Sequence, residues 1–191
     1  YGVRVMSRIA LEGPLVEMIQ LDEHHVASVR TTIERPRLRR TISVLHELVM
    51  DAVGEQGLAP AGPLFTRYHS VGALITLECG LPLAQPITPA GIVVPSFLPG
   101  GPVLHGRHLG DHAGLPAAYR ALESDCTRRG CDPMGGPWEC YIVDGRDSPD
   151  PNEWVTDVYL PVRALVPIDK RRKCGTTKSG LIALPVEQSI R

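Results

Sequence analysis

An internal repeat organises this chain: TISVLHELVMDAVGEQGLAPAGPLFTRY (Thr41–Tyr68) aligns with GLPAAYRALESDCTRRGCDPMGGPWECY (Gly114–Tyr141) at an offset of 73 positions, with one small adjustment before the final tyrosine. The turn residues of the two segments match as well. Gly57, Pro60, Gly62, Pro63 and Tyr68 correspond to Gly130, Pro133, Gly136, Pro137 and Tyr141. Such a self-match predicts two copies of one structural unit.

Each copy contains one amphipathic helix between extended segments. Apolar residues recur every three or four positions, which predicts one buried stripe per helix. The stripes are Ile42, Leu45, Val49 and Val53 in the first copy and Leu115, Ala118, Leu122 and Cys126 in the second. An extended segment precedes each helix and two strand candidates follow it. The predicted unit is therefore strand, helix, strand, strand, at about 24–83 and again at about 90–163.

Two units of this size cannot each bury a sheet face and a helix alone, so they should share one sheet. We predict an α+β fold, in which an antiparallel sheet carries both helices on one face and a ligand cleft on the other. Alternatively, the N-terminal segment or a second subunit, as in a homodimer, covers that open face. The domain should span residues 24–166, with an N-terminal extension at 1–23 and a C-terminal extension at 167–191.

The composition narrows the classes of function. The 20 Lys and Arg residues nearly balance the 21 Asp and Glu residues, which argues against a nucleic-acid or anionic-membrane surface. Five cysteines without a C-x-x-C pair suit free thiols in a reducing cytoplasm. The sequence shows no signal peptide and no long apolar run, so a cytoplasmic protein without a membrane span is expected. It also lacks a G-x-S-x-G elbow, a P-loop and a dinucleotide fingerprint.

A carboxylate interrupts the apolar strand GPWECYIVDG (Gly136–Gly145). Alternation places Glu139 on one face with Tyr141, and Trp138 on the opposite face with Cys140. Both faces are apolar enough to be half buried. Glu139 is therefore either a strand-edge carboxylate bonded to water and backbone N–H groups, or a charge held for a cationic ligand.

At this point the chain resembles the GyrI-like, or AraC-type effector-binding, family of small-molecule-binding domains. The resemblance rests on the repeat, on HLGDHAGLPAAYRAL, on WECY and on WVTDVYLPV, and it covers roughly His24–Arg163. It implies a cleft between the two copies that takes bulky, apolar, often cationic compounds between aromatic walls, with a glutamate as the negative centre. Glu139 matches that glutamate. Some relatives carry a DNA-binding module, but the residues before the first copy are too few for one, so a stand-alone protein is expected.

Four aromatic residues are candidates for the walls of this cleft. Tyr141 shares the face of Glu139, and Tyr68 is its counterpart in the first copy, although both could simply pack within the sheet. Trp138, like Phe65, falls on the other face, where core packing against the helices is expected unless strand twist turns it into the cleft. Phe97 lies beside a Pro/Gly turn and could be a mobile wall.

Other polar residues are given a structural interpretation. Glu78 and Asp157 occupy equivalent positions in the last strands of the two copies. They could form a second acidic contact, but surface placement is expected for both. His105, His108 and His112 lie at spacings of 3 and 4, but intervening glycines and the lack of a cysteine pair argue against a metal site. We expect no metal and no cofactor.

Two functions fit the same site. The first is binding of hydrophobic or cationic small molecules, such as drugs. The second is an enzyme: some members of the family hydrolyse cyclopropane-containing antibiotics, and here Glu139 with Tyr141 could activate water for that reaction. Interaction with DNA gyrase is a weaker alternative, implied only by the family name.

Overall fold

The computed structural model describes residues 16–164, which form nine strands and two α-helices. The elements are β1 (Val16–Leu21), β2 (His24–Glu34), α1 (Leu38–Glu55), β3 (Phe65–Val71), β4 (Leu74–Pro82), β5 (Val94–Leu98), β6 (Gly101–Leu109), α2 (Leu115–Arg129), β7 (Cys131–Pro133), β8 (Trp138–Val143) and β9 (Val155–Ala164). Short 3-10 turns precede α1 at Arg35–Arg37, α2 at His112–Gly114 and β9 at Pro151–Glu153.

One antiparallel sheet connects all the strands, in the order β1-β6-β9-β8-β3-β4-β2-β5, with β7 paired to β9. Outward from the central β3–β8 pair, one half runs β8-β9-β6 and the other runs β3-β4-β2. The two halves meet through three residue pairs, and in the middle one Thr66 faces Glu139. The predicted order of strand, helix, strand, strand is present in each half, whereas the origin of the two units by duplication stays a prediction.

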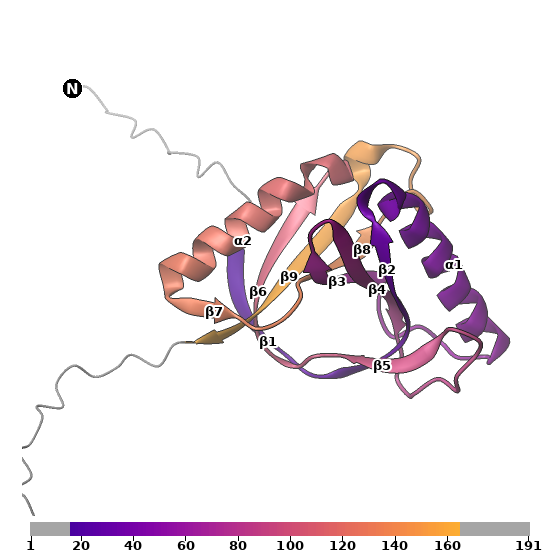
Figure 1. Cartoon of the computed structure of the whole chain (residues 1–191). Helices are drawn as coiled ribbons and strands as arrows, with labels where there is room; N and C mark the ends of the chain where they lie inside the picture. Colours follow the sequence, from indigo (N-terminus) through magenta and orange to yellow (C-terminus); the bar gives the residue numbers. More distant parts are fainter. Residues whose placement is uncertain (1–15, 165–191) are drawn as a thin grey trace, which may run out of the picture.

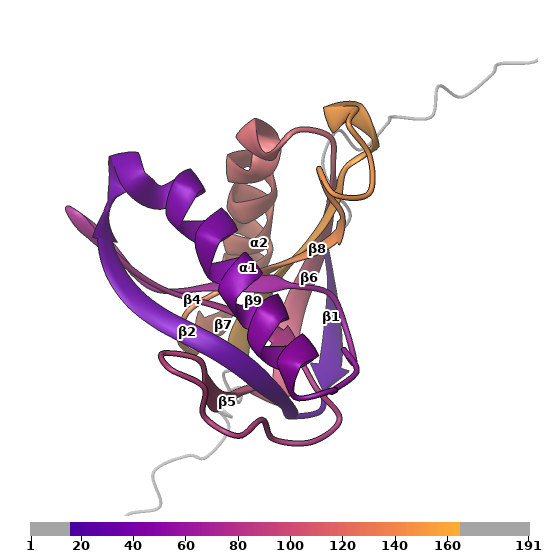
Figure 2. The ribbon, with the colours of Figure 1, turned by 90° about the vertical axis from the view of Figure 1, so that its right-hand side faces the viewer.

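Both helices lie on the same face of the curled sheet (Figures 1 and 2). Helix α1 packs on β2 and β4 through Leu45, Val49 and Val53, three members of its predicted stripe. Helix α2 packs on β6 and β9 through its own stripe, which is buried from Leu115 to Cys126. The α+β prediction, with an antiparallel sheet and two helices, is therefore confirmed.

The opposite face of the sheet has its own apolar core. Phe65 and Trp138 are buried there with Val26, Leu98 and Val103, and residues of β1 pack against them. The expectation that Phe65 and Trp138 pack against the helices is therefore wrong. Alternation shows which residues share a face of a strand, but not which face the helices cover.

The sheet also extends beyond the expected domain start at His24. Strand β1 pairs with β6 along its whole length, so residues from Val16 onward belong to the domain. Strand β5 pairs with β2 at the far edge. The expected C-terminal extension at 167–191, and residues 1–15, lie outside the described part of the chain. Neither of the two described helices has the length and apolar character needed to cross a membrane.

Candidate functional site

A pocket of about 1050 Å³ lies between α1 and α2, above the central strands β3 and β8. Leu38 and Ile42 of α1 form one wall, Leu115 and Tyr119 of α2 form the other, and Tyr68, Glu139 and Tyr141 line the floor. The cleft is thus on the helix face, and the prediction of a cleft on the opposite face is wrong. The reason is the spacing of the helices: each covers the outer strands of its own half, which leaves the central strands open between them.

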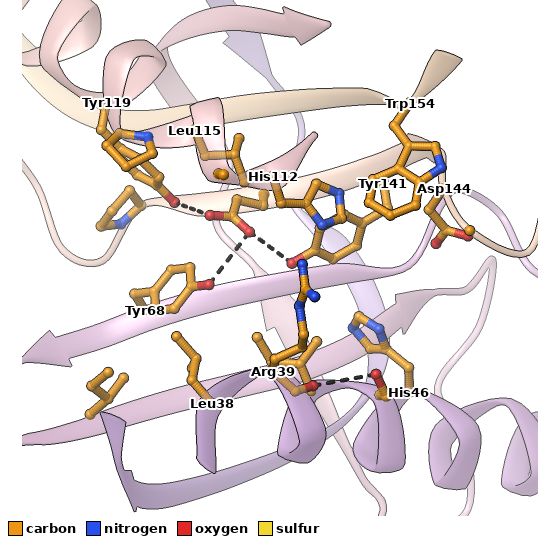
Figure 3. Close-up of a pocket in the computed structure, with 18 of the residues that line it drawn as sticks. Leu38, Arg39, His46, Tyr68, His112, Leu115, Tyr119, Tyr141, Asp144 and Trp154 are labelled. Atoms are coloured by element: carbon orange, nitrogen blue, oxygen red, sulfur yellow. Dashed lines mark hydrogen bonds between the residues drawn. The ribbon is translucent and has the colours of Figure 1, made fainter. Parts of the chain in front are cut away.

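Glu139 is the centre of a buried hydrogen-bond cluster on this floor. Its side chain is 4% exposed. The Tyr141 hydroxyl donates to Oε2 at 2.7 Å and the Tyr119 hydroxyl donates to Oε1 at 2.8 Å. The Tyr68 hydroxyl lies 3.4 Å from Oε2, and the three contacts appear as dashed lines in Figure 3. Three separate elements, β3, α2 and β8, therefore direct phenol groups at one carboxylate.

The protonation of this cluster follows from its burial. Burial raises the pKa of Glu139, while the hydrogen bonds from the tyrosine hydroxyls act in the opposite direction. Burial and the neighbouring carboxylate also raise the pKa of Tyr68, Tyr119 and Tyr141, so the phenols remain protonated donors. Within residues 16–164, Glu139 forms no ion pair with a basic side chain.

Two histidines form the other side of the pocket, beyond the ring of Tyr141. His46 is buried, and burial lowers its pKa to about 4, so it is neutral at pH 7 and its Nε2–H donates to the Phe65 carbonyl at 3.0 Å. The His112 ring lies 5.4 Å from the Tyr141 ring and 4.8 Å from the Trp154 ring, and burial lowers its pKa as well. The pocket therefore combines the buried carboxylate of Glu139 with two neutral imidazoles.

Of the candidate ligand-binding residues, the structure brings Glu139, Tyr141 and Tyr68 together. It places the other two elsewhere. The Trp138 ring stacks on Tyr159 at 5.3 Å, on the far face of the sheet. Phe97 lies on the edge strand β5, packs 4.8 Å from the His25 ring and is 47% exposed. Neither Trp138 nor Phe97 lines the pocket.

Sequence reasoning missed Tyr119, His46 and Trp154 as pocket residues and considered His112 only as a metal ligand. A signal was present for Tyr119, because it lies four residues after Leu115 and so shares the inner face of α2. No local signal distinguished His46, since a polar residue within an apolar stripe only becomes meaningful once the opposite wall is known.

The two acidic residues expected at the surface are buried. Glu78 accepts hydrogen bonds from Ser28 at 2.7 Å and from His69 at 2.8 Å. Asp157 accepts two from the Arg107 guanidinium, at 2.7 and 2.8 Å. The expectation of surface placement is wrong for both, because a nearby donor offsets the cost of burying each carboxylate.

The three closely spaced histidines point to different neighbours. His105 contacts Glu17 through Nδ1 at 3.0 Å, whereas Nε2 of His108 donates to the Asp111 carbonyl at 2.8 Å. His112 lines the pocket. Across residues 16–164, no group of three or more His, Cys, Asp or Glu side chains is arranged to hold a metal ion.

Solved structures show the same fold. The C-terminal domain of EcmrR is 22% identical, with a TM-score of 0.71, covering 80% of this chain and 99% of that one. EcmrR in a complex with DNA is 20% identical, with a TM-score of 0.72, covering 79% of this chain and 58% of that one. A hydrolase from Listeria innocua is 15% identical, with a TM-score of 0.58, covering 79% of this chain and 93% of that one. SAV2435 bound to tetraphenylphosphonium is 9% identical, with a TM-score of 0.55, covering 78% of this chain and 94% of that one. At these identities the likeness establishes the fold alone.

No curated protein matches the chain. The model of one protein family, the GyrI-like small molecule binding domain, matches residues 15–163, which is most of the chain and includes both helices and the pocket between them. The chain therefore belongs to the family of GyrI-like small molecule binding domains.

Proposed function

We propose that this protein binds bulky hydrophobic compounds, many of them cationic, between α1 and α2, with Glu139 as the negative centre. The buried carboxylate of Glu139 is the observation that carries the proposal. It is 4% exposed, is held by tyrosine hydroxyls and has no basic partner among the described residues. A carboxylate so placed gains from a cation that is weakly hydrated and can enter an apolar cavity.

The shape and lining of the pocket support this class of ligand. Its volume of about 1050 Å³ is at the upper end of sites for drug-sized molecules. The walls combine aliphatic side chains with the aromatic rings of Tyr68, Tyr119, Tyr141 and Trp154. Aromatic rings attract a cation by roughly 0.5–2 kcal/mol each and set few conditions on the shape of the ligand. SAV2435, which has the same fold, was solved with the hydrophobic cation tetraphenylphosphonium.

The replacement Glu139→Gln tests this role because it keeps the shape of the side chain and removes its charge. Titration calorimetry should show tetraphenylphosphonium binding at least about tenfold more weakly to the variant. Triphenylphosphine oxide, a neutral compound of similar shape, should lose much less affinity. Glu34→Gln, which removes an exposed carboxylate at the end of β2, is the matched control. Equal affinity of wild type and Glu139→Gln for the cation contradicts the proposal.

A second candidate function is hydrolysis of strained, electrophilic cyclopropane compounds at the same site. The observation that favours it is a carboxyl group with a raised pKa beside a phenol donor, Tyr141, at 2.7 Å. Water would attack a carbon of a cyclopropane ring conjugated to a carbonyl, so that a C–O bond forms, the strained C–C bond breaks and its electron pair moves to the carbonyl oxygen. Glu139 would accept the proton of the water, and the Tyr141 hydroxyl would donate to that carbonyl oxygen. A structural relative from Listeria innocua is described as a hydrolase.

Turnover separates the two functions. Catalytic amounts of protein are incubated with a cyclopropane electrophile, and the water adduct is measured by mass spectrometry. Accumulation of adduct beyond one equivalent per protein, lost in Glu139→Gln, supports the hydrolase. Protection of one equivalent without adduct supports binding alone.

A further inference from the structure

One polar atom of the pocket is buried without a partner. Within residues 16–164, several buried side-chain nitrogen and oxygen atoms lack a hydrogen bond, and among them only Nε2 of His112 belongs to a residue that lines the pocket. The ring itself is fixed between Tyr141 and Trp154, at 5.4 and 4.8 Å. Because an unpaired buried polar atom is costly, a ligand that supplies the missing partner gains affinity.

The surroundings of His112 indicate which kind of partner fits. Arg39 of α1 lines the same pocket and extends toward the Tyr141 ring (Figure 3). Burial is the main cause that lowers the pKa of His112, and the charge of Asp111 opposes it. The positive charge of Arg39 lowers this pKa further. A guanidinium group can only donate hydrogen bonds. Among the described residues Arg39 forms no ion pair, so its charge is available to a ligand.

Two other polar groups on this side, Asp144 and His46, are already engaged. Asp144 accepts hydrogen bonds from the side chain and the backbone of Arg146, which neutralises its charge. Nε2 of His46 is used by the Phe65 carbonyl. Arg39 is therefore a donor to spare, as is Nε2 of His112 in the tautomer that carries the proton on that nitrogen, and an anionic oxygen is their natural complement.

The donor side and the carboxylate of Glu139 are separated by one side chain. The hydroxyl of Tyr141 bonds to Glu139, while its ring faces His112. We propose that the pocket is built for amphiphilic compounds that carry a carboxylate or similar anionic oxygen about one tyrosine length from a hydrophobic, cationic body, with His112 and Arg39 as the residues that select it. This rests on the proposed function, because Glu139 must hold the cationic part.

Two probes that differ only at the acceptor test the inference: (3-carboxypropyl)triphenylphosphonium and its methyl ester. In titration calorimetry at pH 7.5, wild type should bind the acid about tenfold more tightly than the ester, since a charge-assisted hydrogen bond replaces a neutral one. Arg39→Gln and His112→Phe should each reduce this preference, because the affinity for the acid falls by more than the affinity for the ester. His112→Gln keeps a donor and should restore part of the preference. Arg40→Gln, an exposed neighbour on α1 that does not line the pocket, is the matched control and should behave as wild type.

The possible outcomes separate the two proposals. If wild type binds neither phosphonium, the proposed function fails. If it binds acid and ester equally, or prefers the ester, binding stands and the inference is overturned. If the preference for the acid persists in both Arg39→Gln and His112→Phe, these residues do not select the acceptor and the inference is again overturned. The ester also reports on folding, because a variant that still binds it has an intact pocket.

Discussion

The three tyrosines around Glu139 should contribute unequally to its ionisation. Tyr141→Phe removes a hydroxyl 2.7 Å from Oε2, whereas Tyr68→Phe removes one at 3.4 Å, beyond the usual range for an O–H···O bond. A hydrogen bond to a charged group contributes roughly 1.5–3 kcal/mol. Since one pKa unit corresponds to about 1.4 kcal/mol, Tyr141→Phe should raise the pKa of Glu139 by about one to two units. Tyr68→Phe should raise it by less than about half a unit.

Cation affinity measured against pH reports this pKa, because tetraphenylphosphonium has no titratable group of its own. Only ionised Glu139 attracts the cation, so affinity should fall as the pH drops through the pKa of that residue. Titration calorimetry between pH 4 and pH 9 should place the midpoint of this fall at higher pH in Tyr141→Phe than in wild type. Tyr119→Phe, which removes a hydroxyl at 2.8 Å, should resemble Tyr141→Phe.

Glu139→Gln is the internal control for these profiles, because it should abolish the pH step altogether. Equal midpoints for Tyr141→Phe and Tyr68→Phe would refute the assignment of strength by distance. A midpoint that moves to lower pH in Tyr141→Phe would refute the role of the phenol as a donor to the carboxylate.

Two further predictions concern stability. In Gly136→Ala the new Cβ would lie 2.0 Å from the backbone oxygen of Tyr68, so β3 and β8 must separate. Urea unfolding should show that the free energy of unfolding falls by about 3 kcal/mol, and a fall below about 0.5 kcal/mol contradicts this geometry. Burial raises the pKa of Asp157, but hydrogen bonds from Arg107 and His105 outweigh it and hold that pKa well below the ordinary value of 3.8. Because this pKa is depressed in the folded state, the ionised Asp157 stabilises the fold above the unfolded-state pKa, and the stabilisation is lost on acidification. Denaturation curves should show Asp157→Asn to be less stable than wild type at pH 7, with a difference in unfolding free energy that narrows below about pH 4. A difference that does not depend on pH contradicts this.

The sequence predicted the central part of the site because that part depends on local pattern. Alternation in β8 puts Glu139 and Tyr141 on one face, and the repeat links Tyr141 to Tyr68 on β3. The pairing of β3 with β8 then brings all three together. Alternation and the repeat were sufficient to place these three side chains together, whereas the ligand role of Glu139 came from the family resemblance and stays a prediction.

The remaining errors concern which face of the sheet the helices cover and which distant strands pair. Trp138 is on the face opposite Glu139, as alternation requires, but that face is not the one covered by helices. Alternation along a strand shows which residues share a face, but it does not show whether helices cover that face. Phe97 was grouped with the second copy by position in the chain, whereas β5 pairs with β2 of the first half. Long-range pairing of this kind leaves no local trace in the sequence.

The short junction between β3 and β8 has a mechanical consequence. Three residue pairs and two flanking backbone hydrogen bonds join β3 to β8, and each half carries one wall of the pocket on its own helix. A small change of twist at this junction would therefore change the distance between α1 and α2. Glu139 belongs to the middle pair and so lies at the junction itself, where displacement is least. The width of the pocket can follow the bulk of the guest while the position of the charge remains constant.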